Sequence, residues 1–311
     1  MDVLREDWVF ASYPGQIITT PHYRIHTTVD YPHITDALPS FLEFALTQYR
    51  RALADLPAPP RRMETYLFAD RRQWSGKTRQ MLPDQSATFQ HLGRGGFTTR
   101  GTAILYYIDY NRRGRDTLAI AAHEGWHQYT QSTFRTPLPI WLEEGIATYM
   151  EGCRIVNGNL TFRPWQNWER RRTLGEAIRD DRLIPLAELL NARPQAYLGS
   201  GQDQLLTYYA QVWALTRFLA DGAKGRYRAP LGSVLTDAAK GSLIRHVRRS
   251  PDVSAAVSRH GGSPAGMGSL VILAYFNNDL SAFENEYLAY ARTLAQGGPT
   301  RGWQERRRTP D

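Results

Sequence analysis

Short β-like runs and one long amphipathic helix alternate in the first part of the chain. Residues 16–29 set isoleucine, tyrosine and valine among threonine and histidine, with a break at Pro21, and this pattern predicts two short strands. Between 34 and 56, apolar side chains recur three and four residues apart, which is the spacing of a helix with one buried face. The prolines at 57–60 should end that helix.

The next segment predicts two more strands around a helix. We expect a strand at 63–69, a helix at 71–80 and a strongly formed strand at 103–108, where every side chain is apolar or aromatic. The glycine-rich segment 93–101 lacks the strand-to-helix setting of a phosphate-binding loop. We expect it to be a loop beside the chemical site of the following helices.

Helical spacing dominates from residue 116 onward. Helices are predicted at 116–131 and 140–151, with an extended turn at the prolines of 137–139 between them. The pair Asn157-Gly158 between β-like flanks predicts a hairpin over 154–162. The remaining predicted elements are helices at 165–179, 203–220, 232–240, 242–249 and 279–294, and a short turn at 185–190.

This order of elements predicts an α+β protein, with a small mixed β-sheet followed by a mostly helical C-terminal lobe. We expect an N-terminal α/β subdomain at 1–132, a mainly helical subdomain at 133–296 and a flexible basic tail at 297–311, where glycine, proline and charge dominate. The chain shows no recurring period of roughly 20 to 50 residues, which excludes solenoids and propellers.

Composition is that of a soluble globular protein, with 311 residues and 42% hydrophobic side chains. The formal charge of +8 comes mostly from scattered arginines, so we expect a solvated surface and no nucleic-acid partner. No run approaches the roughly 18 apolar residues of a membrane span, and 1–10 lacks the apolar segment of a signal peptide. The sequence does not indicate a cellular compartment. Cys153, the single cysteine, excludes an intrachain disulfide. We expect it to be a small buried or half-buried side chain, with a reactive thiol as the alternative.

The clearest chemical signal is the segment His123-Glu124-Gly125-Trp126-His127. Residues four apart share a helical face, so both imidazoles can reach one metal ion. Glu124 then lies beside the open position of the metal, where it can take a proton from water and pass it to the leaving group. Two helical histidines that bind no metal are the alternative.

The next predicted helix offers a third ligand. The segment 141–147 reads WLEEGIA and carries the carboxylates Glu143 and Glu144. A catalytic zinc site needs three protein ligands and an open position, and a carboxylate on an antiparallel neighbouring helix can complete the set. Spacing alone leaves open which glutamate binds, and a solvated acidic pair is the alternative.

HEGWHQ and WLEEGIATY resemble the gluzincin branch of zinc peptidases, which includes the thermolysin, clostridial collagenase and aminopeptidase N families. They are most similar to the bacterial peptidase MA-like domain proteins. The resemblance implies a zincin, or thermolysin-like, fold with one Zn²⁺ per chain. In relatives with a W-L-x-E-G-x-A stretch, the glutamate directly before the glycine is the third ligand. This implies His123, His127 and Glu144 as the metal ligands and Glu124 as the catalytic base.

A third segment, 209–219, resembles the helix that begins with a catalytic tyrosine in the aminopeptidase N relatives. The resemblance implies that Tyr209 hydrogen-bonds the oxyanion, with Tyr208 as the alternative. By the same resemblance, 103–108 corresponds to the edge strand that pairs with an extended substrate. Those aminopeptidases grip the free amine through a G-x-M-E-N stretch, whereas 95–99 reads GGFTT and has no carboxylate. An endopeptidase is therefore favoured over an aminopeptidase.

We predict a zinc metallopeptidase that acts on a peptide or protein substrate. A zinc hydrolase of a non-peptide substrate and a catalytically inactive peptide-binding protein on the same fold are the alternatives. Gln128 and Thr148 are candidates for orienting the ligands, although either side chain could be satisfied locally. His22 and His26 form only a weak second pair, and we expect no second metal site.

Overall fold

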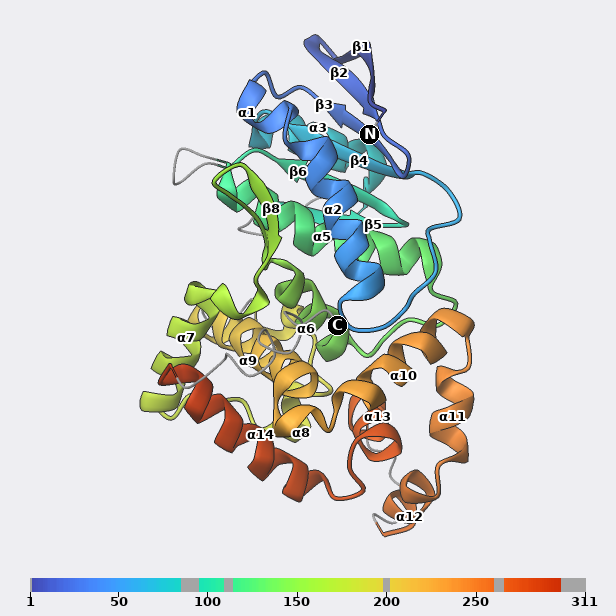
Figure 1. The fold of residues 1–311 in the computed structure, drawn as a ribbon, viewed down its shortest axis with the longest axis vertical. Coiled ribbons are helices and arrows are strands. Elements are labelled where there is room, and N and C mark those ends of the chain that lie inside the picture. Colours follow the sequence, from blue (N-terminus) through green and yellow to red (C-terminus); the bar gives the residue numbers. More distant parts are fainter. Residues whose placement is uncertain (1, 85–94, 109–113, 198–201, 260–265, 298–311) are drawn as a thin grey trace, which may run out of the picture. The chain divides into compact units, whose positions relative to one another are not determined.

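The computed structural model of the chain describes residues 2–84, 95–108, 114–197, 202–259 and 266–297 (Figure 1). The chain divides into two compact units. Unit 1 comprises Met1–Ala52, Leu56–Phe134 and Met150–Pro164, and unit 2 comprises Leu53–Asp55, Arg135–Tyr149 and Trp165–Asp311. Residues 150–164 thus group with the N-terminal part, although the sequence places them in the helical subdomain. Residues 298–311, which belong to the predicted flexible tail, lie outside the described residues.

Unit 1 is built on a six-stranded mixed sheet of order β1-β2-β3-β4-β6-β5. The strands β3 and β4, and likewise β4 and β6, pair in parallel, while the other neighbours are antiparallel. The strands are β1 (Leu4–Phe10), β2 (Tyr13–Thr19), β3 (Tyr23–Thr27), β4 (Met63–Phe68), β5 (Gly96–Thr99) and β6 (Thr102–Tyr106). With the helices of both units, this sheet confirms the α+β class.

Helices cover both faces of the sheet. The helices of unit 1 are the short α1 (Pro32–Thr35), then α2 (Leu38–Arg51), α3 (Arg71–Met81) and α5 (Arg115–Thr133). On β4, Thr65 faces α5, because its hydroxyl donates to Gln128 Oε1 at 3.1 Å. Phe68 points to the opposite face, as the alternation of a strand requires. There it joins the side chain of Trp74 on α3 in one buried cluster.

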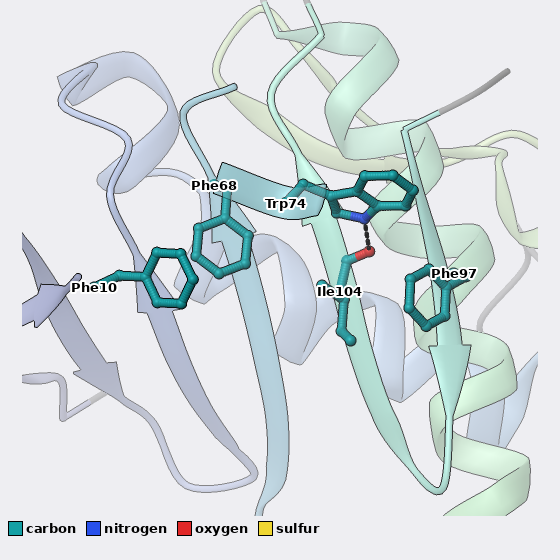
Figure 2. Close-up of a cluster of buried hydrophobic side chains, with 5 residues drawn as sticks. All are labelled: Phe10, Phe68, Trp74, Phe97 and Ile104. Carbon is teal, nitrogen blue, oxygen red and sulfur yellow. Dashed lines mark hydrogen bonds between the residues drawn. The ribbon is translucent and has the colours of Figure 1, made fainter. Parts of the chain in front are cut away.

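Figure 2 shows that cluster, which also contains Phe10, Phe97 and Ile104. The rings of Phe10 and Phe68 lie 4.7 Å apart between centroids. The indole Nε1 of Trp74 donates to the backbone oxygen of Ile104 at 3.0 Å, so the one polar atom of this side chain is satisfied. The aromatic face therefore ties β1, β4, β5 and β6 to α3.

The prediction that 103–108 forms the edge strand is wrong, because β6 lies between β4 and β5. The prediction of a loop over 93–101 is also wrong for Gly96–Thr99, which form the edge strand β5. Residues 93 and 94 lie outside the described residues. A strand of four residues, with one large apolar side chain, has too short a pattern to be identified before its pairing with β6 is known.

The predicted hairpin is confirmed as β7 (Cys153–Val156) and β8 (Asn159–Phe162), which pair antiparallel. Asn157 and Gly158 have φ of 51° and 77°, the left-handed conformation that a tight hairpin turn demands. Cys153 is buried as expected, and burial raises the pKa of its thiol.

Unit 2 is mostly helical, in agreement with the sequence. Its helices are α6 (Ile140–Met150), α7 (Trp168–Arg179), α8 (Leu186–Leu189), α9 (Gln202–Asp221), α10 (Arg228–Lys240), α11 (Leu243–Arg249), α12 (Pro251–Arg259), α13 (Met267–Tyr275) and α14 (Leu280–Ala295). Short 3₁₀ turns lie at Pro164–Gln166, Pro194–Tyr197 and Ala223–Gly225. The sequence did not indicate α12 and α13. Of the helices in the described ranges, none is long and apolar enough to cross a membrane.

The long helix α9 forms the centre of unit 2 and supports α6. A Cβ atom added to Gly145 of α6 would lie 2.3 Å from Thr216 Oγ1 and 2.7 Å from the backbone oxygen of Val212. The glycine of the WLEEGIA segment is therefore needed for the close approach of α6 to α9. This contact fixes the position of the preceding residue, Glu144, within unit 2.

Candidate metal centre

The helix α5 carries His123, Glu124 and His127, as predicted. The two imidazole rings lie 5.0 Å apart between centroids, so they share one face of the helix. Near its N-terminal end, α5 is joined by Thr117 to the segment that follows β6. The hydroxyl of Thr117 accepts from the backbone N–H of Ile108 at 2.8 Å and donates to the backbone oxygen of Ile108 at 2.7 Å.

Gly125, inside the HEGWH segment, lets α5 approach α2 closely. The hydroxyl of Tyr49 donates to the backbone oxygen of Ala122 at 2.8 Å. A Cβ atom on Gly125 would lie only 2.5 Å from the same Tyr49 hydroxyl. The residue between the histidines is thus fixed by packing, and α2 helps to set the position of the α5 face that carries His123 and His127.

Gln128 joins α5 to the sheet. Its Nε2 donates to the backbone oxygens of Glu64 at 2.6 Å and Gly101 at 3.1 Å, and its Oε1 accepts from Thr65. The side chain is buried. The hydrogen bonds of Gln128 are therefore made to the sheet and its turn. Its side chain is satisfied locally, which was the alternative to a role in orienting the metal ligands.

His123, His127 and Glu144 each offer one ligand atom, and these atoms all lie within 4.8 Å of one another. Of the Glu143–Glu144 pair, Glu144 is the residue that belongs to this group. Two imidazole nitrogens and one carboxylate oxygen are donors that suit a divalent transition metal, and three ligands leave a coordination position open. The donor set therefore fits a bound divalent metal ion.

Glu151 supports one of the imidazoles, and the sequence did not identify this role. Its Oε1 lies 3.1 Å from His123 Nδ1, and the two side chains are only 14% and 13% exposed. A histidine that donates Nδ1–H to a carboxylate keeps the lone pair of Nε2 for a metal. The only sequence signal is the position of Glu151, two helical turns after Glu144 and directly after α6.

Thr148, the other candidate for orienting the ligands, is satisfied within α6. Its hydroxyl lies 3.0 Å from the backbone oxygen of Glu144 and 2.8 Å from that of Gly145. Such bonds back to the preceding turn are common for threonine in helices. Thr148 therefore stabilises α6 locally.

Tyr208 and Tyr209 are neighbours in the first half of α9 and differ in environment. Tyr208 is completely buried and packs on Tyr197, with 5.5 Å between ring centroids. Burial, together with the nearby charge of Glu144, raises the pKa of Tyr208. Tyr209 is half-buried, and its ring centroid lies 5.2 Å from the guanidinium carbon of Arg170.

The histidines His22 and His26 bind different carboxylates. His22 Nδ1 lies 2.8 Å from Glu43 Oε2, and His26 Nε2 lies 2.7 Å from Glu64 Oε2. Within the described ranges, the group around His123 is the one set of three such side chains placed so that they could hold a metal ion.

The candidate centre thus combines three side chains that could hold a metal ion, the carboxylate of Glu124 on the helix of the two histidines, and a carboxylate bonded to His123. A family model, a curated protein or a solved structure with this arrangement would be an independent indication of its chemistry. Comparison of the chain with family models, curated proteins and solved structures finds no match.

Proposed function

We propose that the protein is a zinc metallopeptidase of gluzincin type with a thermolysin-like fold, in which His123, His127 and Glu144 hold one Zn²⁺. The observation that carries the proposal is the convergence of these three ligand atoms within 4.8 Å. Glu124, which lies on α5 with the two histidines, is the proposed base. When bound, zinc would lower the pKa of a coordinated water and polarise the carbonyl of the substrate.

The protein's own residues supply the proton transfers. Glu124 accepts a proton from the attacking water and delivers it to the leaving amine. Tyr209 donates a hydrogen bond to the developing oxyanion. Its half-buried position supports this role over that of Tyr208, because a donor must present its hydroxyl to the substrate, and Tyr208 is completely buried.

The edge strand β5 supports a peptide substrate. An extended peptide can add to the open edge of a sheet through backbone hydrogen bonds. In this chain β5 lies at the edge of the sheet, and its residue Thr98 contacts Glu124. The pairing function that the sequence assigned to 103–108 therefore belongs to β5. Since 95–99 contains no carboxylate to bind a free amine, we infer endopeptidase activity.

Zinc analysis and a base variant test the proposal together. The purified protein should hold about one zinc per chain and cleave members of a broad peptide library. Glu124→Gln should keep the zinc and the melting temperature and lose hydrolysis by roughly 10²- to 10⁴-fold. Glu143→Gln, which changes a carboxylate outside the ligand group, is the matched control.

Three outcomes separate the possibilities. Absence of zinc binding would overturn the metal centre itself. Full zinc occupancy without cleavage of any peptide would favour the non-peptide hydrolase or the inactive peptide-binding protein. Undiminished hydrolysis by Glu124→Gln would refute the assigned base.

A further inference from the structure

Thr98 lies on β5, the edge strand of the sheet in unit 1. Its neighbour Phe97 points to the α3 face, where its ring lies 5.8 Å from that of Trp74 between centroids. Because side chains alternate along a strand, Thr98 points to the opposite face, toward α5. Backbone pairing of Thr98 with Ala103 on β6 fixes its register.

The Thr98 hydroxyl lies within hydrogen-bond distance of the carboxylate of Glu124, the proposed base. Its Oγ1 lies 2.9 Å from Glu124 Oε2 and 3.0 Å from the backbone oxygen of Glu124. A hydroxyl donates one proton, so these two acceptors compete for it. A hydrogen bond to Oε2 holds one carboxylate oxygen and leaves Oε1 available to accept a proton from water.

The Thr98 hydroxyl is well placed to orient the flexible side chain of Glu124. A glutamate side chain has three rotatable bonds, and a general base works only within hydrogen-bond reach of the proton it takes. Threonine is β-branched and stiff at χ1, so its hydroxyl is a well-fixed partner on a strand. Glu124 is half-buried, so water competes less for its carboxylate and the hydrogen bond from Thr98 is strengthened.

We propose that Thr98 is a positioning residue that orients the carboxylate of Glu124 for proton transfer. The inference rests on the proposed function, since it assigns Glu124 the role of base. The competing interpretation is structural: the hydroxyl bonds only to the backbone oxygen and fastens β5 to α5. The two interpretations differ in what removal of the hydroxyl does to the Glu124 side chain.

Two variants of Thr98 and one control separate them. Thr98→Val keeps the β-branched shape and removes the hydroxyl, whereas Thr98→Ser keeps the hydroxyl. Thr19→Val makes the same change on β2, a strand that has no part in the proposed catalysis or substrate pairing. We expect Thr98→Val to lower kcat by about 10-fold or more, with KM unchanged, by analogy with other supporting hydrogen bonds. Thr98→Ser should recover most of the rate, and Thr19→Val should match the parent protein.

A readout independent of activity is the conformation of Glu124 in crystal structures of the metal-free proteins. We expect one ordered Glu124 conformer in the parent protein and in Thr98→Ser, and several conformers in Thr98→Val. A single unchanged Glu124 conformer in Thr98→Val would overturn the proposal even if the protein hydrolyses no peptide. Equal loss of kcat in Thr98→Val and Thr98→Ser would also overturn it. Failure of the parent protein to cleave peptides would instead count against the proposed function, and the crystallographic comparison would still decide the role of Thr98.

Discussion

His123 Nδ1 lies 3.1 Å from Glu151 Oε1, although the two residues are far apart in the chain. Both side chains are almost buried, which strengthens a hydrogen bond between them and limits competition from water. The contact selects the tautomer of His123 that carries its proton on Nδ1 and presents Nε2 to a metal. Glu151 is thus tied to the proposed zinc chemistry without being a ligand.

Replacement of Glu151 should weaken metal binding. Glu151→Ala leaves His123 Nδ1 without this partner, and we expect zinc affinity to fall by about 10- to 100-fold. Competition with a chromophoric chelator measures the affinity directly. Glu143→Ala, which removes a carboxylate outside the ligand group, should bind zinc as the parent protein does. Equal affinity in Glu151→Ala and the parent protein would show that Glu151 does not support the ligand.

The tyrosine pair on α9 should separate into a catalytic and a structural residue. Tyr209→Phe should lower kcat by about 10²-fold or more, because it removes the proposed oxyanion donor. The hydroxyl of Tyr208 is buried and has no hydrogen-bond partner in the described part of the chain. Its removal in Tyr208→Phe should leave kcat unchanged and keep or raise the melting temperature, since no hydrogen bond is lost. Loss of kcat in Tyr208→Phe alone would reverse the assignment.

Helical periodicity predicted the two helices that carry the candidate metal ligands. The helix expected at 116–131 is observed at Arg115–Thr133, and the helix expected at 140–151 is observed at Ile140–Met150. Both signals are local, because a helix places residues three and four apart on one face whatever surrounds it. The pairing of the two histidines therefore followed from sequence alone.

The supporting contacts could not be predicted in this way. The bond between Glu151 and His123, and the bond between Thr98 and Glu124, join segments that only the folded chain brings together. The edge position of β5 depends on its pairing with β6, which a four-residue pattern does not reveal. Sequence spacing thus indicates which side chains share a helix face, while tertiary packing decides which partners orient them.

Zinc should stabilise the folded protein through its ligands. A ligand that binds only the native state at 100 times its Kd stabilises that state by about 2.7 kcal/mol. We expect the melting temperature to rise on zinc addition to the chelator-treated protein and to fall again with excess chelator. His127→Ala should lack this response, while His22→Ala, which removes a histidine bonded to Glu43, should retain it. A zinc-dependent rise in His127→Ala as large as in the parent protein would place the binding site elsewhere.

The contact between Gly125 and Tyr49 should appear as an energetic coupling. Gly125→Ala would place a Cβ atom 2.5 Å from the buried Tyr49 hydroxyl, and we expect it to lower the free energy of unfolding by about 1 to 3 kcal/mol. Tyr49→Phe alone should cost about 1 kcal/mol, because the hydrogen bond to the backbone of Ala122 is lost. Gly76→Ala in α3 is the matched control, since its Cβ would meet only the Phe10 ring at 3.8 Å.

Helix propensity alone should make Gly76→Ala neutral or stabilising by up to about 1 kcal/mol. In the double variant Gly125→Ala, Tyr49→Phe, the oxygen that opposes the new Cβ is gone, and the nearest ring carbons lie at 3.3 and 3.4 Å. The double variant should therefore be more stable than the sum of the single changes predicts, by about 0.5 kcal/mol or more in urea unfolding. Strict additivity would show that the Tyr49 hydroxyl is not the group that requires glycine between the two histidines.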